Sequence, residues 1–312
     1  MKNKKWLAAL AGAGCVLFFV ENRRSNQCLG MNEYTIESHK IPKSFDGKKI
    51  AFLSDLHNNE LGKDNEKIFR MLEEINPDYV FVGGDMIVSK MTSDSETAIA
   101  FMTELAGKYT VYCGNGNHES RLQWKEEKYP ETGVIYRNYI KKLKNGGVKH
   151  LYNETIRIEE GSDFIYLSEL ELSKDYYKKL CSQTLPLSYM ESRLGTCEDD
   201  SFHILLSHNP AYFETYAQWG ADLTLSGHVH GGIMRLPFLG GVISPSYELF
   251  PKYDGGYFEK EHHKMIISMG LGSHSIKIRL FNPPKIDVIT LKREGKEIHN
   301  EFREYPCQNT GV

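Results

Sequence analysis

Five short clusters of acidic, amide and histidine residues constrain this chain of 312 residues more than any other feature. Each cluster comes directly after an apolar run that is short enough to be a buried strand. Because ligands bind at the carboxyl ends of the strands in an open α/β sheet, this placement predicts that the clusters meet at one edge. In chain order they are Asp55-Leu56-His57, Gly84-Asp85, Gly116-Asn117-His118-Glu119, Ser207-His208 and Gly227-His228-Val229-His230-Gly231.

The apolar runs alternate with helical patterns, which predicts an α/β (α+β) fold. Residues 64–75 carry apolar side chains at helical spacing and end at Asn76-Pro77. Residues 121–200 mix both patterns, and we interpret them as an extension of the same domain. Strands are predicted at 49–53, 79–82, 110–112, 155–159, 163–167, 202–206, 222–225, 265–269 and 286–291, and further helices at 95–106, 133–143 and 175–180.

The first thirty residues read as a separate segment. Residues 6–20 carry no charge and would span about 22 Å as a helix, short of the roughly 20 residues that a transmembrane helix usually needs. No small-residue cleavage site follows Val20, so we predict an uncleaved membrane anchor over 1–30 rather than a signal sequence or a buried core helix. A polar linker at about 21–33 would lead into one domain over 31–312.

The balance of basic residues slightly favours a domain outside a bacterial cell membrane. Lys2, Lys4 and Lys5 precede the apolar run, whereas Arg23 and Arg24 follow it.

The composition argues against two kinds of ligand, namely nucleic acid and a zinc ion held by thiolates. The net charge is −3 and no long basic run is present, so we expect no nucleic-acid partner. The six cysteines are scattered and form no Cys-x-x-Cys pair, so we expect no zinc–thiolate site. The oligomeric state is left open.

The clusters together suit two divalent metal ions about 3.5–4 Å apart. Alternate residues of a strand point the same way, so Asp55 and His57 can reach one ion. Asp85 is the candidate bridge, and Asn117 offers an amide oxygen. Oxygen and nitrogen donors suit manganese, zinc or iron without choosing among them. The candidate ligands are Asp55, His57, Asp85, Asn117, His208, His228 and His230.

Such a centre predicts hydrolysis of a phosphoester by metal-activated water. We expect Asp85, Asn117 and His118 to take part in catalysis, with His118 protonating the leaving oxygen or holding a phosphate oxygen. The role of His274, in a glycine-rich stretch, stays undecided.

These motifs resemble the calcineurin-like metallophosphoesterases, whose pattern is D-x-H, G-D, G-N-H-[DE], H and G-H-x-H. The resemblance spans about residues 48–291 and implies a four-layer αββα sandwich with a dinuclear centre. It implies that Asp55, His57, Asp85 and His230 hold one ion, that Asp85, Asn117, His208 and His228 hold the other, and that His118 is the proton donor. Residues 235–241, 249–253 and 278–282 further resemble a bacterial membrane-associated branch of the family.

The substrate is the least constrained inference. Residues 234–258 are rich in Leu, Phe and Tyr, which fits either core packing or an apolar rim beside the metals. With the N-terminal segment, the rim favours a lipid-linked phosphodiester or pyrophosphate. The alternative function is a membrane-tethered metal-binding protein without catalysis.

Overall fold

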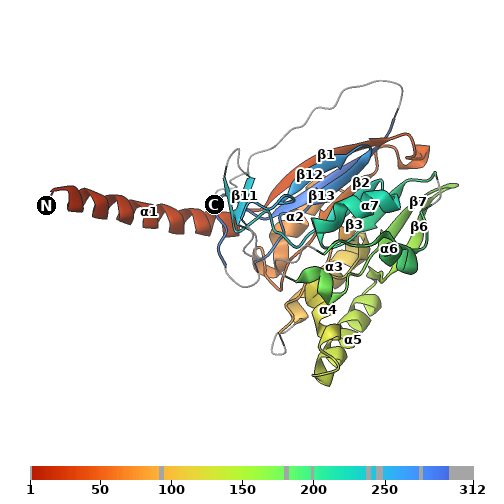
Figure 1. The fold of residues 1–312 in the computed structure, drawn as a ribbon, viewed down its shortest axis with the longest axis horizontal. Helices are drawn as coiled ribbons and strands as arrows, with labels where there is room; N and C mark the ends of the chain where they lie inside the picture. The colour runs from red at the N-terminus through yellow and green to blue at the C-terminus, as the bar shows by residue number, and fades with distance from the viewer. Residues whose placement is uncertain are drawn as a thin grey trace.

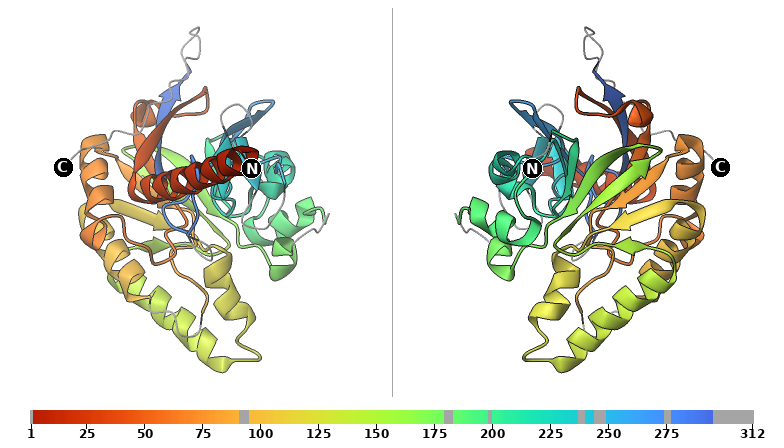
Figure 2. Two further views of the ribbon diagram at one scale, coloured as in Figure 1. Left: turned by 90° about the vertical axis from the view of Figure 1, so that its left-hand side faces the viewer. Right: turned by 90° about the vertical axis from the view of Figure 1, so that its right-hand side faces the viewer.

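Two six-stranded β-sheets pack face to face, and helices cover their outer faces (Figures 1 and 2). The computed structural model describes residues 2–90, 95–178, 183–197, 200–236, 240–243, 249–273 and 277–294.

The first sheet has the strand order β1-β14-β2-β3-β4-β5. The strands β2 to β5 are parallel, and β14 is antiparallel to β2 but parallel to β1. The last strand of the described chain therefore lies between the first two. The strands are β1 (Gly30–Ser38), β2 (Lys49–Leu53), β3 (Tyr79–Val82), β4 (Thr110–Cys113), β5 (Lys149–His150) and β14 (Lys285–Arg293).

The second sheet has the order β12-β13-β9-β8-β7-β6. Its four inner strands are parallel, and an antiparallel strand closes each side. A separate two-stranded hairpin, β10–β11, follows the last polar cluster. The strands are β6 (Glu154–Glu160), β7 (Asp163–Glu169), β8 (His203–Leu206), β9 (Leu223–Ser226), β10 (Met234–Leu236), β11 (Gly240–Ile243), β12 (Gly256–Lys260) and β13 (His263–Ile267).

Three apolar layers hold the sandwich together. Phe52 and Phe81 of the first sheet pack against Ile204 and Leu225 of the second between the sheets. The helices α2, α3 and α5 cover the outside of the first sheet, shown from orange to yellow-green in Figure 2, and α6 and α7 cover the second, shown in green and teal. The helices are α1 (Lys2–Gln27), α2 (Glu66–Ile75), α3 (Glu96–Lys108), α4 (Asn117–Trp124), α5 (Pro130–Asn145), α6 (Leu187–Leu194) and α7 (Phe213–Trp219), with short 3-10 helices η1 (Lys43–Phe45), η2 (Lys63–Asn65), η3 (Lys174–Tyr177) and η4 (Pro210–Tyr212).

This arrangement confirms the predicted four-layer α/β sandwich. The predicted strands at 49–53 and 79–82 coincide with β2 and β3, and the predicted helix at 95–106 lies within one or two residues of α3. The stretch 175–180 is a 3-10 helix over Lys174–Tyr177, and 179–182 lies outside the described residues.

The predicted polar linker at about 21–33 is wrong. Residues 21–27 continue α1, and β1 begins at Gly30. Strand β1 was not predicted because most of its residues are polar and most of its side chains are exposed or half-buried. Only Ile36 of this strand is completely buried in the core between the sheets.

The N-terminal helix projects from the sandwich (Figure 1). It is 26 residues long, so it extends beyond the uncharged run at both ends, into Lys2 and into Glu21. Within the part of the chain that the structure describes, no helix is both long and apolar enough to cross a membrane. The predicted transmembrane helix is therefore not seen.

Strand β14 contains a buried carboxyl group, that of Asp287, and this burial makes the free energy of unfolding depend on pH. Burial raises the pKa of Asp287 from 3.8 to about 7, although Asn32 and Lys285 act in the opposite direction. Because the folded chain holds this proton more tightly than the unfolded chain, the group's stabilising contribution is complete below about pH 4 and is lost as pH rises through about 7.

We expect Asp287→Asn to remove this term. The free energy of unfolding of the metal-free variant should exceed that of the parent chain at pH 8 by about 2–4 kcal/mol, and the difference should shrink toward pH 4. Urea unfolding at several pH values measures it, with the exposed Asp64→Asn as the control. Parallel pH profiles for Asp287→Asn and the parent chain would contradict the expectation.

Candidate metal centre

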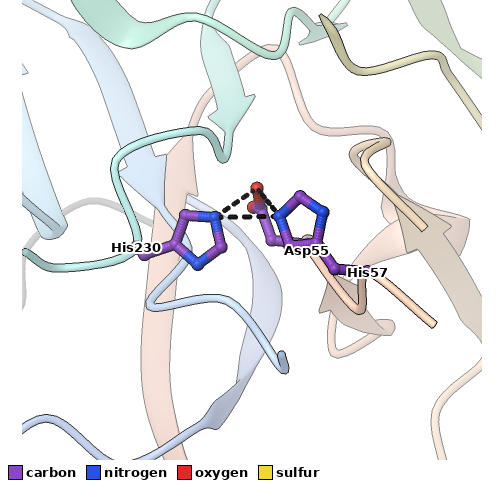
Figure 3. A group of neighbouring side chains, drawn as sticks. All are labelled: Asp55, His57 and His230. Carbon is purple, nitrogen blue, oxygen red and sulfur yellow. Dashed lines mark hydrogen bonds and ion pairs between the residues drawn. The ribbon is translucent and has the colours of Figure 1, made fainter. Parts of the chain in front are cut away.

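Asp55, His57 and His230 converge where β2 and β9 end (Figure 3). His230 Nε2 lies 3.0 Å from Asp55 Oδ1 and 3.1 Å from His57 Nε2, and the two imidazole rings are nearly parallel. His57 Nε2 is 3.7 Å from the same carboxylate oxygen. Three potential ligand atoms from two sheets thus point at one place.

Asp85, His208 and His228 form a second group. His208 Nε2 lies 3.2 Å from Asp85 Oδ2 and 3.7 Å from Asp55 Oδ1. Asp85 Oδ2 is also 3.9 Å from His57 Nε2, so this carboxylate lies between the two groups.

Close backbone contact fixes Asp85. A Cβ on Gly84 would lie 2.0 Å from the amide nitrogen of Gly116, so only glycine fits. The amide N–H of His118 donates to Asp85 Oδ1 at 2.7 Å, which leaves Oδ2 to face the histidines. Gly84 and Gly116 therefore let the loops after β3 and β4 touch, and this contact orients one carboxylate oxygen of Asp85 toward the histidines.

The ligand loops hold an uncommon backbone conformation. Asp55, His57, Asp85, His228 and His230 all have φ between +51° and +70°. Each such non-glycine residue costs of order 1 kcal/mol, and clusters of them are typical of functional sites. Sequence patterns give no signal for this strain.

Glu119 locks the Asp85 loop. It is buried and accepts backbone N–H groups of Asp85, Met86, Ile87 and Gly116 at 2.9–3.2 Å. Burial and the nearby Asp85 raise the pKa of Glu119 to about 7, against the lowering effect of these donors. The last residue of the Gly-Asn-His-Glu cluster thus holds the loop rather than facing the ligands.

The charges are arranged to receive cations. Burial alone would raise the pKa of Asp55, but His230 and His208 hold it well below its usual range. His208 and His118 do the same for Asp85. Burial lowers the pKa of His57 and lowers that of His228 to about 3, so both imidazoles are neutral, as metal ligands must be.

His208 has a fixed tautomer. Its Nδ1 lies 2.7 Å from the carbonyl oxygen of Gly83, to which it donates, so Nε2 faces the two carboxylates. Burial opposes protonation, but Asp85 and Asp55 raise the pKa of His208 to about 10. A cation between these groups would replace that proton.

The residues fit two divalent metal ions. Asn117 Oδ1 is buried and has no hydrogen-bond partner among the residues that the structure describes. Donors bound to one ion at about 2.0–2.2 Å lie about 3 Å from each other, which is the spacing around His230 Nε2. Nitrogen and oxygen donors without thiolate suit several first-row ions.

His118 stands beside the ligands. Its Nδ1 accepts the amide N–H of Ser89 at 2.9 Å, so a neutral ring carries its proton on Nε2, 4.0 Å from Asp85 Oδ2. The ring meets His57 edge to face, with centroids 4.9 Å apart.

The structure thus brings together seven of the residues predicted for the site, with Asn117 buried next to His118 in the chain: Asp55, His57, Asp85, His118, His208, His228 and His230. His274 lies outside the described residues.

Three residues beside the site were not predicted from the sequence. Ser54 Oγ donates to Asp55 Oδ2 at 2.6 Å, next to a predicted ligand. Tyr177 packs edge to face on His228, with centroids 5.2 Å apart. Glu171, two residues past the end of β7, is buried beside Ser120 and Asn115, and its burial raises its pKa to about 7. The region around Tyr177 and Glu171 has no repeated pattern that could have marked them.

Known proteins with related sequences support the same chemistry. An uncharacterized metallophosphoesterase of Bacillus subtilis, YkuE, is 29% identical over 267 residues, covering 83% of this chain and 84% of the relative. A bovine transmembrane protein with a metallophosphoesterase domain is 29% identical over 265 residues, covering 81% of this chain but 55% of the relative. The UDP-2,3-diacylglucosamine pyrophosphatase LpxG of Chlamydia muridarum is 23% identical over 303 residues, covering 80% and 86%.

The family model for calcineurin-like phosphoesterases matches residues 48–232, more than half of the chain. This range contains all five polar clusters and the convergent ligand groups. The chain therefore belongs to the calcineurin-like phosphoesterase family and is a phosphoester hydrolase.

Proposed function

We propose that the protein is a dinuclear metal-dependent phosphodiesterase or pyrophosphatase. The observation that carries this proposal is the position of Asp85 Oδ2 between two sets of imidazoles, within 3.2 Å of His208 Nε2 and 3.9 Å of His57 Nε2. A carboxylate shared by two ligand sets is what a pair of adjacent cations requires.

The ligands divide into two sets that share Asp85. Asp55, His57 and His230 would complete one set, and Asn117, His208 and His228 the other. Manganese, zinc and iron all suit these donors. When bound, two divalent ions supply Lewis-acid activation of water and neutralise phosphate charge.

The protein's own part is positioning and proton transfer. The strained loops and the donors around Asp85 fix the ligand atoms before substrate arrives, which lowers the cost of reaching the reactive geometry. Because Ser89 occupies Nδ1 of His118, the Nε2–H is the proton available to a leaving oxygen. His118 would therefore act as the general acid.

We expect the chelator-treated protein to lose hydrolysis of bis(p-nitrophenyl) phosphate and to regain it with manganese, zinc or iron. Asp85→Asn should abolish turnover while the chain still folds, because a neutral amide cannot replace the charged carboxylate that both ligand sets share. Circular dichroism checks the fold, and metal analysis counts the bound ions. Near-normal turnover by Asp85→Asn would exclude the two-metal assignment.

The variant His118→Gln separates catalysis from metal binding. It should keep two metals per chain yet lose about 100-fold or more in kcat, the range of general acid catalysis. The loss should be larger for an alkyl ester than for a nitrophenyl ester, whose leaving group needs no proton. If the parent chain bound two metal ions but hydrolysed none of these esters, the result would favour the alternative, a membrane-tethered metal-binding protein.

A lipid-linked substrate and a membrane location form the finer part of the proposal. The relative LpxG acts, by its name, on a diacylated sugar nucleotide. Helix α1 exposes Trp6, Leu17 and Phe19, each about 70% accessible, beside basic residues at its start. Leu249 and Phe250, which come after the metal-ligand loops, are also exposed. Such apolar surface is typical of a protein that lies on a membrane.

We propose that α1 attaches the protein to a bacterial cell membrane, with the catalytic domain on its outer side. The exposed apolar side chains of α1 support the attachment.

We expect a long-chain phosphodiester to be hydrolysed with at least tenfold higher kcat/KM than its short-chain analogue, because each buried methylene contributes about 0.8 kcal/mol. In the full chain, Phe19→Asp should reduce co-sedimentation with anionic vesicles but not turnover of the short-chain ester. Phe250→Ser should reduce the preference for the long chain. Equal efficiency on both esters would argue against a lipid substrate.

A further inference from the structure

The segment 278–282, which resembles part of a bacterial membrane-associated branch of the family and contains no metal ligand, includes a buried arginine. The Arg279 guanidinium donates to the carbonyl oxygens of Met269, Gly270, Gly272 and Asn282 at 2.6–3.2 Å. Its Nε donates to Ser273 Oγ at 3.2 Å. Burial lowers the pKa of Arg279 to about 10, which leaves it charged at neutral pH, and Asp55 favours that charge.

The loop that Arg279 holds lies directly against two predicted ligands. A Cβ on Gly270 would lie 2.8 Å from His230 Nδ1 and 3.0 Å from Asp55 Cβ. The amide N–H of Gly272 donates to the carbonyl oxygen of Asp55 at 2.7 Å. Arg279 thus positions the surface on which Asp55 and His230 rest.

Asn282 fixes the other side of the same ligand. Its side-chain amide donates to the carbonyl oxygens of His230 and Gly232 at 2.6 Å each. The His230 backbone has φ of +54°, an unfavourable conformation that such contacts maintain.

The N-terminal helix is bonded to this segment. Asn22 Oδ1 accepts the amide N–H of Arg279 at 2.9 Å, and its side-chain amide donates to the carbonyl oxygen of Lys277 at 3.2 Å. Glu21 Oε1 accepts the amide N–H of Phe281 at 3.0 Å. Arg24, which pairs with Glu21, lowers the pKa of Glu21 to about 2, so the acceptor stays ionised. Three hydrogen bonds therefore join α1 to the backbone on both sides of Arg279.

We infer that Arg279 and Asn282 are positioning residues for the Asp55–His230 half of the metal centre, and that Glu21 and Asn22 of α1 hold them in place. The inference rests on the proposed dinuclear centre and deepens it. The end of α1 therefore stabilises one metal site. Loss of its hydrogen bonds to this segment lowers the metal affinity of that site and the activity.

The test is a calorimetric titration of the metal-free full-length protein with Mn²⁺. His230→Ala and His228→Ala first identify which binding event belongs to which ligand set. Asn22→Ala should then weaken the event that His230→Ala removes, by about fivefold or more for two lost hydrogen bonds, and leave the other event unchanged. Arg279→Lys, which keeps the charge but not the planar set of donors, should weaken the same event further.

Two further variants on α1 separate positioning from general destabilisation. Gln27→Ala truncates an exposed amide on the same helix and should bind Mn²⁺ as the parent chain does. Asn22→Asp keeps the acceptor for the Arg279 amide and should restore most of the affinity lost in Asn22→Ala. Equal Mn²⁺ binding by Asn22→Ala and Gln27→Ala would overturn the inference. A parent chain that binds none of Mn²⁺, Zn²⁺ and Fe²⁺ would instead overturn the proposed function.

Discussion

The structure depends on keeping two carboxylates ionised inside a protein interior. Asp55 and Asp85 are almost completely buried, and removing a charged carboxylate from water is costly unless it is paired and hydrogen-bonded. The surrounding imidazoles supply the opposing charge, while Ser54 and the amides of His118 and His228 occupy individual carboxylate oxygens. Such a centre is stable when protons or metal cations occupy it, and the sandwich provides the rigid frame that keeps its members together.

The two sheets have different tasks in this frame. The first sheet supplies the carboxylates, the amide and the His57 imidazole from the ends of β2, β3 and β4, whereas the second supplies His208, His228 and His230 from the ends of β8 and β9. The apolar layer between Phe52, Phe81, Ile204 and Leu225 therefore sets the distance between the ligands of the two sheets. A core substitution that shifted one sheet against the other would change ligand spacing without touching a ligand.

Much of the site could be predicted because its ligands lie in short clusters of neighbouring residues. Each cluster stands immediately after its strand, so a correct strand at 49–53 or 79–82 also places its ligands. Contacts between distant segments leave no such pattern. Strand β1 was missed because its residues are mostly polar, and Glu171 and Tyr177 were missed because their neighbours come from other elements. The left-handed backbone at Asp55 and His230 was equally invisible, since neither residue is glycine.

The position of β14 has a consequence for how the protein is made. This strand, residues 285–293, lies between β1 and β2, and it pairs Lys285 with Gly30 far earlier in the chain. The first sheet cannot close until β14 has left the ribosome, and pairings over such sequence separations form slowly. Arg279 and Asn282 arrive just before β14, so the loops that carry Asp55 and His230 acquire their support at the same late stage. A chain that is still being synthesised therefore has no complete metal centre, and it cannot hydrolyse a phosphoester until β14 has been made.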